Sequence, residues 1–515
     1  MAKIPFIPHT SNEMLLFPPN LGDFIEEDSP VRLFNDVLGQ VDIKELRETY
    51  HNWFGGRPAF DPMMLLKVVV YGYFNEIYST RALERALRRD AHLIWLSGYQ
   101  FPDHTTISRF KARCSGSIKK IFSSLVSILV REGYVSLAED LYIDGTTIRS
   151  RAAKRKIKWR NAARNFSAMA DEKINKAVQT LLEYIDAGDR DELVEEGRAS
   201  YTPEAARELA EAVEKSMAKG DQRLRGKINA VLDACDAKEA HEKTIELCHG
   251  RCGIAPADPD SGIIHAKEDG YNAKPTPNYN VQIATQNQYV TNYGVYNTSS
   301  DKTVAVNFVE TCISENGIKP RAVVADAGYG CEEVYVSLER IDVEAVVKYN
   351  NFDKEVSRRL SKKNGAFNRY GFILTSSQNN LVCPAGHRMK IVGISKTFTE
   401  HGFPCEITKF TCSRHKNCAL KDKCPVAKNK NKTTSHSLES MRQEAKARKR
   451  LLQPQNQARL RRRNIEPEAV FGQLKHNHGY RKFRHFGKSN VTTDLGLMFM
   501  ALNLSKLYKN IQKAR

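Results

Sequence analysis

The sequence has no hydrophobic run long enough to cross a membrane. Its most apolar stretch, residues 495–504, is about half the length of a membrane-spanning helix, and the first residues lack the uninterrupted apolar core of a secretory signal peptide. The chain also lacks a serine or tyrosine motif that would mark a covalent nucleophile. We therefore expect a cytoplasmic protein with no membrane partner, whose chemistry does not pass through a covalent enzyme intermediate.

Acidic residues are scarce relative to basic ones. Lys and Arg number 79 against 60 Asp and Glu, so the formal net charge is +19 at pH 7. A surplus of this size is typical of proteins with a polyanionic partner, and nucleic acid is favoured here because no segment suits a membrane. With 41% hydrophobic residues among 515, the chain has enough apolar material for several packed cores and about three domains.

Closely spaced Cys-x-x-Cys pairs are also absent, although the chain has 11 cysteines. An odd number, clustered late in the chain, fits reduced thiols or a metal site better than a disulfide framework. One interpretation is a structural zinc site, and the other is reduced cysteines packed in a small β domain. The four cysteines that would bind the zinc ion are Cys383, Cys412, Cys418 and Cys424.

Two stretches share a pattern in which an apolar run ends in an aspartate and a glycine follows. Residues 141–143 precede Asp144, and residues 322–325 precede Asp326. Such runs predict buried strands that each deliver a carboxylate to the edge of a sheet. A third acid, Glu468, begins a helix-like segment. Two strand-end aspartates and one helical glutamate suit two Mg²⁺ ions in phosphoryl transfer, with Asp144 bridging both ions and Mn²⁺ able to substitute.

Glu466 competes with Glu468 for the role of third acid. The two lie about 200° apart on a helix, so only one can face the aspartates. Glu468 shares a face with Gly472 and Lys475, which leaves a gap for a phosphate and supplies a positive charge. Pro467 places Glu466 at the helix start, where its ordinary role is to interact with the positive end of the helix. We therefore expect Glu468 to be catalytic.

Basic residues gather after the first predicted strand and again near the C-terminus, where they alternate with aromatic side chains at residues 480–486. A run of charge is usually only solvated, but these two runs adjoin the predicted catalytic segments. Alternating basic and aromatic residues are typical of contacts with single-stranded or distorted DNA. The residues that we expect to contact DNA here are Arg149, Arg151, Lys154, Arg481 and Arg484.

The first 120 residues predict a helical domain. Asp61 and Pro62 mark the start of an almost wholly apolar helix, and residues 102–111 form a short helix with hydroxyls, a histidine and basic side chains. Such a helix suits base reading in DNA through Arg109 and Lys111. Taken alone, the segment is explained more simply as a helical domain with a solvated basic face.

Together these segments resemble bacterial insertion-sequence DDE transposases, which have a ribonuclease-H-like core and an N-terminal helical DNA-binding domain. An acid and a lysine at the spacing of Glu468 and Lys475 also occur in that family. One departure is Asn464, where an arginine is common, with Arg463 beside it. The resemblance is carried in order by LLKV (65–68), STR (79–81), PDHTTI (102–107), YIDGT (142–146), NYNVQ (278–282), ADAGY (325–329) and the Glu468 helix.

The resemblance implies a transposase that binds terminal inverted repeats, cleaves DNA and joins the freed strands to a target duplex. It also implies a homodimer on DNA, at the bacterial nucleoid. Two alternatives are a catalytically silent DNA-binding descendant, which loss of an acid would favour, and a ribonuclease-H-like nuclease, which would leave the N-terminal domain without a task.

The expected fold class is α/β, with a ribonuclease-H-like mixed sheet, an N-terminal all-α domain, a helical insertion and a small cysteine-rich β insertion. Asp301 is expected only to cap a helix. The expected domains are 1–120 for DNA binding, 136–150 with 272–349 and 455–510 for the catalytic core, 151–271 for a basic and helical insertion, and 350–450 for the cysteine-rich insertion and basic linker.

Overall fold

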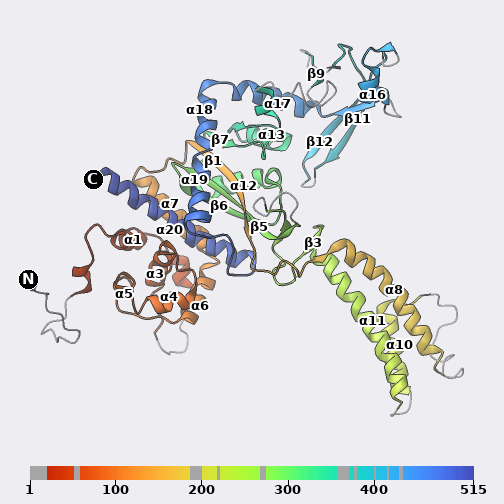
Figure 1. Cartoon of the computed structure of the whole chain (residues 1–515), viewed down its shortest axis with the longest axis horizontal. Helices are drawn as coiled ribbons and strands as arrows, with labels where there is room; N and C mark the ends of the chain where they lie inside the picture. The colour runs from red at the N-terminus through yellow and green to blue at the C-terminus, as the bar shows by residue number, and fades with distance from the viewer. Residues whose placement is uncertain are drawn as a thin grey trace, which may run out of the picture. The chain divides into compact units, whose positions relative to one another are not determined.

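The computed structural model describes residues 20–50, 58–185, 200–216, 221–266, 274–356, 371–375, 380–399, 402–414, 417–428 and 433–515. The chain divides into two compact units, Met1–Ser136 with Thr493–Arg515, and Leu137–Thr492. The first unit is helical and the second mixes helices with a large sheet (Figure 1). The protein is therefore of the mixed α/β class. None of the described helices is both long and apolar enough to cross a membrane.

The first unit is built from short helices around an apolar centre. The helix α3 (Pro62–Phe74) starts as expected, because the Asp61 side chain accepts a hydrogen bond from the Met63 backbone amide. The helix α6 (His104–Cys114) is capped in the same way by Asp103. The other elements are η1 (Leu21–Phe24), α1 (Pro30–Gly39), α2 (Lys44–Glu48), α4 (Thr80–Ala86), α5 (Ala91–Leu96), α7 (Ile118–Arg131) and most of α20 (Lys488–Ala514).

The C-terminal helix completes this unit. Lys111 Nζ on α6 lies 2.7 Å from Asp494 Oδ1 on α20 and 2.6 Å from the Tyr73 hydroxyl, and both charged side chains are buried. The Tyr73 hydroxyl also hydrogen-bonds to Asp494. A buried charge needs a partner, so this cluster fixes α20 to the early helices. Residues from Thr493 onward thus group with the helical unit, although the sequence led us to expect them in the catalytic core.

A six-stranded sheet organises the second unit. Its strand order is β4–β5–β1–β7–β8, with β6 also paired to β5. The strand β5 is antiparallel to β1, β4 and β6, whereas β1, β7 and β8 are parallel. The strands are β1 (Asp140–Arg149), β4 (Gly262–Ile264), β5 (Thr276–Gln286), β6 (Tyr289–Tyr296), β7 (Ala322–Ala325) and β8 (Glu344–Val347).

Helices pack against this sheet and bury its central strands. Every residue of β7 is buried, as the uninterrupted apolar run predicted. One core cluster joins Tyr142 on β1 and Val324 on β7 to Phe308 on a helix that follows β6. The helices of this part are α12 (Asp301–Asn316), α13 (Glu332–Arg340), α14 (Phe352–Val356), α17 (Leu438–Leu451), α18 (Pro454–Arg463) and α19 (Glu466–Gly472), which continues into the π-helical turn η6 (Gln473–Asn477).

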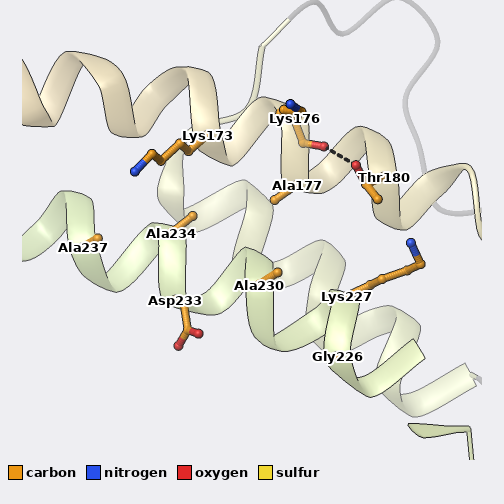
Figure 2. A pocket seen from close by; sticks show the side chains of 10 residues that line it. All are labelled: Lys173, Lys176, Ala177, Thr180, Gly226, Lys227, Ala230, Asp233, Ala234 and Ala237. Atoms are coloured by element: carbon orange, nitrogen blue, oxygen red, sulfur yellow. Dashed lines mark hydrogen bonds between the residues drawn. The ribbon is translucent and has the colours of Figure 1, made fainter. Parts of the chain in front are cut away.

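Between β1 and β4 the chain forms a set of helices with its own core. The helices α8 (Arg160–Leu182), α10 (Pro203–Ser216) and α11 (Gln222–Leu247) lie side by side (Figure 1) and bury Ile174, Val178 and Val231 among others. Short strands β2 (Lys158–Trp159) and β3 (Gly253–Ile254) pair at its base. Figure 2 shows an open cavity of about 500 Å³ between α8 and α11, lined by alanines and by Lys173, Lys176 and Lys227.

A small β module follows β8. Its main sheet is antiparallel, in the order β11 (Lys390–Phe398), β12 (Pro404–Thr411) and β13 (Thr433–His436). Two short strands, β9 (Ile373–Leu374) and β10 (Leu381–Val382), pair beside it, and η5 (Lys421–Lys423) and α16 (Pro425–Lys428) connect β12 to β13.

Candidate active site

Asp144 and Asp326 lie level with each other at the edge where two parallel strands separate. The last paired residues of β1 and β7 are Tyr142 and Val324, and each aspartate follows two positions later. Because β7 ends at Ala325 while β1 continues along β5, no described strand pairs with the β7 side of β1 between Asp144 and Arg149, where a bridge to Lys482 begins. The structure thus brings together the two aspartates that the repeated sequence pattern singled out.

Arg463, the last residue of α18, lies among three carboxylates. Its Nη2 atom is 2.7 Å from Asp144 Oδ1 and 3.4 Å from Asp326 Oδ2, and its Nη1 atom is 3.7 Å from Glu468 Oε1. Only 9% of the Arg463 side chain is exposed, and its buried Nε atom has no hydrogen-bond partner among the described residues. Three acids from two strands and a helix therefore converge on one cation.

The three acids differ in exposure. The Asp144 side chain is 15% exposed, against 41% for Asp326 and 61% for Glu468. Burial raises the pKa of Asp144 to about 6, while the Arg463 guanidinium opposes the rise and the charge of Asp326 adds to it. A carboxylate in these surroundings is stabilised in its charged form by further positive charge.

The two competing glutamates of α19 have different surroundings. Glu466 is buried, its Oε1 atom accepts from Arg462 Nε at 3.0 Å, and its Oε2 atom accepts from the backbone amide of Gln288 at 2.5 Å. Glu468 instead reaches Arg463 beside the two aspartates. The structure therefore places Glu468 at the carboxylate cluster and Glu466 at the β5–β6 turn.

A fourth acid, Asp301, also lies close to this cluster, and the sequence analysis missed it. Its Oδ1 atom accepts hydrogen bonds from Asn280 Nδ2 at 3.0 Å and from Gln282 Nε2 at 2.8 Å. The residue before it, Ser300, is the N-cap and makes no side-chain capping bond. The expectation that Asp301 caps α12 is therefore wrong. The only sequence signal was the pair of amides two positions apart in NYNVQ, which share one face of a strand.

The chemistry of these side chains suits a hard divalent cation. Mg²⁺ prefers oxygen ligands, and carboxylates from different elements supply them here. In the described part of the chain, however, no three His, Cys, Asp or Glu side chains are arranged to hold a metal ion directly. The Arg463 guanidinium lies between the carboxylates and keeps them apart. The carboxylate oxygens suit the predicted ions. The Arg463 guanidinium would have to move away from the carboxylates for the ions to bind.

Two basic stretches that are far apart in the sequence meet at the end of β1. The backbone amide of Phe483 donates to the Arg149 carbonyl at 2.8 Å, and the backbone amide of Arg149 donates to the Arg481 carbonyl. Arg151 Nη1 donates to the Arg484 carbonyl at 3.0 Å. Four of the residues predicted to contact DNA thus lie together in what we call the basic strip, defined by Arg149, Arg151, Arg481 and Arg484. A DNA contact of Lys154, three residues after Arg151, stays a prediction.

The aromatic residues of this strip do not all have the role that the sequence suggested. Tyr480 and Phe483 are buried and pack edge to face, with ring centroids 5.9 Å apart. Phe486 is exposed, but Arg151 lies over its ring at 4.9 Å. Tyr480 and Phe483 therefore belong to the core and cannot stack on DNA bases in this conformation.

Lys475 is buried, although we expected it on an exposed helical face with Glu468. The α-helix ends at Gly472 and a π-helical turn follows, so Lys475 does not continue the α-helical face. The surroundings of Gly472 agree with the predicted gap for a phosphate, since a Cβ atom added there would meet no described heavy atom within 4 Å.

The two basic residues predicted on α6 have opposite locations. Arg109 is exposed and lines a cavity of about 570 Å³ with Arg88 and Arg113. Lys111 is buried in its contact with Asp494. The expectation that Lys111 contacts DNA is therefore corrected: its charge is used inside the helical unit.

Three of the four cysteines proposed as zinc ligands share one small core. Cys383, Cys412 and Cys424 are buried in the same cluster as Phe410. Burial above all raises the pKa of the Cys412 thiol, and the neighbouring thiols of Cys383, Cys424 and Cys418 raise it further. Since no described group of three such residues is arranged to bind a metal ion, zinc remains a prediction.

Two protein-family models match the chain. The model described as Transposase DDE domain matches residues 382–508, which contain Arg463, Glu468 and Lys475. The model described as Transposase domain (DUF772) matches residues 19–113, which contain almost all of α6. No curated protein and no solved structure matches.

Proposed function

Since both matching families consist of transposase domains, and together they indicate an insertion-sequence DDE transposase, we propose that the chain cuts DNA at the ends of a mobile element and joins the freed strands to a target duplex. The observation that carries this proposal is the convergence of Asp144, Asp326 and Glu468 on one buried cation at the open edge of β1.

The strand order supports a ribonuclease-H-like core. An antiparallel set, β5 with its neighbours β4 and β6, adjoins a parallel set of β1, β7 and β8. The first acid lies on the central strand, the second follows the adjacent parallel strand, and the third lies on a helix near the C-terminus. This arrangement builds one site from segments that lie more than 300 positions apart in the sequence, in the order of motifs that the family resemblance implies.

Asp144, Asp326 and Glu468 would hold two Mg²⁺ ions, which in this chemistry activate the attacking oxygen and stabilise the leaving oxygen of an in-line displacement at phosphorus. Arg463 balances the negative charge of the acids and leaves its place between them as the site loads. The open β7 side of β1 admits the DNA strand, and the basic strip holds the backbone beside it.

The helical unit supplies recognition of the element ends in this proposal. Arg88, Arg109 and Arg113 border one cavity beside α6, and Thr105 and Ser108 are exposed on that helix. Arginines in a row can bind phosphates, and the hydroxyls can reach base edges. Binding of two ends at once requires a homodimer on DNA, which is part of the proposal.

A cleavage assay on the element's own terminal repeats tests the proposal. Wild-type protein should nick these duplexes only with Mg²⁺ or Mn²⁺, while Asp326→Asn should bind the same DNA and leave it intact. Equal cleavage of a scrambled duplex would instead favour a nuclease, and binding without any cleavage by the wild-type protein would favour a silent DNA-binding descendant.

For the cysteine module we propose a structural zinc ion bound by Cys383, Cys412, Cys418 and Cys424. The support is that three of these thiols share one core and that the other three thiols add to the rise in the pKa of Cys412. Elemental analysis of tag-free protein should give about one zinc per chain, lost in Cys418→Ser but not in Cys235→Ser. Metal-free protein with this module folded would contradict the proposal.

A further inference from the structure

We propose that Asp301 is a fourth carboxylate of the catalytic centre and binds a divalent cation together with Asp326. The inference rests on the proposed function, since it adds a ligand to the same metal centre. It differs from the three-acid set that the family resemblance implies.

Asp301 lies at the first position of α12, where an acid would ordinarily cap the helix or interact with its positive end. Its Oδ1 atom turns instead to Asn280 and Gln282 on β5. No described residue donates a hydrogen bond to its Oδ2 atom. One oxygen is thus anchored to the sheet, and the other is available to a ligand.

The free oxygen lies next to the second catalytic aspartate. A Cβ atom placed on Gly328 would lie 2.9 Å from Asp326 Oδ1 and 3.6 Å from Asp301 Oδ2. Two carboxylate oxygens from different elements therefore border the same point beside Gly328. Since like charges repel, a cation bound between the two carboxylates would make the arrangement favourable.

Asp301 also borders β1 one position after the first catalytic aspartate. A Cβ atom on Gly145, the residue after Asp144, would lie 2.6 Å from Asp301 Oδ1 and would collide with the Gln282 amide. Each strand-end aspartate is followed within two positions by a glycine. At Gly145 the absent side chain makes room for Asp301 and Gln282, whereas a Cβ atom on Gly328 would meet Asp326 Oδ1 and would be in ordinary contact with Asp301.

A buried set of polar side chains fixes the orientation of Asp301. The Tyr329 hydroxyl donates to Gln282 Oε1, which leaves the Gln282 amide nitrogen to donate to Asp301 and to Asn280 Oδ1. Asn280, Gln282 and Tyr329 are all buried. Hydrogen-bond donors of this kind hold a metal-binding carboxylate in position. The ionised carboxylate itself only accepts hydrogen bonds.

Electrostatic balance points in the same direction. Arg463 pairs with Asp144, Asp326 and Glu468, and the structure gives it no ion pair with Asp301. Three carboxylates thus share one guanidinium, and Asp301 adds a further negative charge nearby. Metal ions would neutralise this charge, whereas a purely structural Asp301 would leave it in place.

Mn²⁺ binding to the full-length, metal-free protein without DNA tests the proposal, because it does not depend on activity. Asp301→Asn keeps an oxygen acceptor for Asn280 and Gln282 but removes the charge. We expect its Mn²⁺ affinity, measured by calorimetry or electron paramagnetic resonance, to fall about tenfold to a hundredfold. The Mn²⁺ concentration that gives half-maximal cleavage should rise by the same factor, while DNA binding stays unchanged.

Asp140→Asn is the matched control. Asp140 lies on β1 as Asp144 does, but its carboxylate pairs with Arg321 and Arg459, each at 2.9 Å. This variant should unfold at lower temperature and bind Mn²⁺ like the wild-type protein. If Asp301→Asn does not fold by circular dichroism, Asp301→Ser, which keeps a hydroxyl acceptor, takes its place with the same expected loss of affinity.

Asp144→Asn separates the two proposals. If it weakens Mn²⁺ binding and the Asp301 variant does not, Asp301 is not a ligand and only this inference falls. If neither variant changes Mn²⁺ binding, the metal centre itself is refuted, and the proposed function falls with it. A lower unfolding temperature of Asp301→Asn with wild-type Mn²⁺ affinity would make Asp301 a structural residue.

Discussion

Glu466 and Glu468 lie two positions apart on α19 and have opposite surroundings. The first is buried between Arg462 and the Gln288 backbone amide, and the second is largely exposed beside Arg463. From the sequence we preferred Glu468 because it shares a helical face with Gly472 and Lys475, and because Pro467 places Glu466 at the helix start. The contacts of Glu466 support the same assignment, because both of its carboxylate oxygens are hydrogen-bonded in a structural role.

Glu468→Gln should abolish metal-dependent cleavage and leave unfolding by urea unchanged. Glu466→Gln should retain cleavage but lower the free energy of unfolding by about 1–3 kcal/mol, because a buried carboxylate loses its charge-assisted hydrogen bonds. Cleavage assays and urea titrations on both variants check this. Cleavage that survives in Glu468→Gln and disappears in Glu466→Gln would reverse the assignment.

Lys111 and Arg109 form a second contrasting pair on one helix. Lys111→Met leaves Asp494 buried without its partner, so we expect a loss of about 3–5 kcal/mol in the free energy of unfolding. Arg109→Met removes an exposed charge, so it should change stability by less than about 0.5 kcal/mol and weaken DNA binding. Urea unfolding and a DNA titration distinguish them, and equal stability of the two variants would contradict the buried pair.

At the scale of elements, glycines at two catalytic segments differ in what surrounds them. Gly145 lies on β1 against Gln282 and Asp301, whereas Gly472 ends α19 in open space. Gly145→Ala should lower the free energy of unfolding by about 1–3 kcal/mol through overpacking. Gly472→Ala should raise it by up to about 1 kcal/mol, because alanine favours a helix.

Thermal unfolding of the two alanine variants gives the stability test, and cleavage gives a second one. If a phosphate backbone passes Gly472, the alanine there should slow cleavage without loss of stability. If Gly472→Ala is both stable and fully active, the open space at Gly472 is not needed for cleavage.

Much of the catalytic edge was predictable because its signals are local. An apolar run before Asp144 and another before Asp326 indicate strands, and two parallel strands place such residues at one edge. Asp301 was misjudged because its partners, Asn280 and Gln282, lie about twenty positions away on another element. Lys111 was misjudged for the same reason: Asp494, which neutralises it, lies in the last helix. The π-helical turn that buries Lys475 leaves no mark in a helical pattern.

At the scale of the whole molecule, the surplus of positive charge should appear as salt dependence. DNA affinity should fall steeply with salt, and Arg151→Ala should reduce the slope of log affinity against log salt by about 1, for any duplex sequence. Lys319→Ala is the control, because Lys319 already pairs with Asp342 at 3.1 Å. An unchanged slope in Arg151→Ala would exclude the basic strip from the DNA interface.

The division into units changes which fragment should bind DNA alone. A fragment ending near residue 120 leaves Lys111 buried without Asp494, so it should be poorly folded. A fragment of residues 1–136 joined by a flexible linker to residues 488–515 restores the pair and should unfold cooperatively and prefer terminal repeats. Circular dichroism melts and competition with scrambled DNA compare the two, and a stable shorter fragment would contradict the role of α20.

Because α20 belongs to the same unit as the first helices, that unit can be completed only at the end of synthesis. At about 5–20 residues per second, the ribosome needs on the order of 20–70 s to add residues 137–492 after the early helices have emerged. Throughout that interval Lys111 has no Asp494 to neutralise it. The recognition unit of a nascent chain is therefore unfinished until translation reaches α20, so prematurely terminated chains should not occupy the element's ends in competition with the complete enzyme.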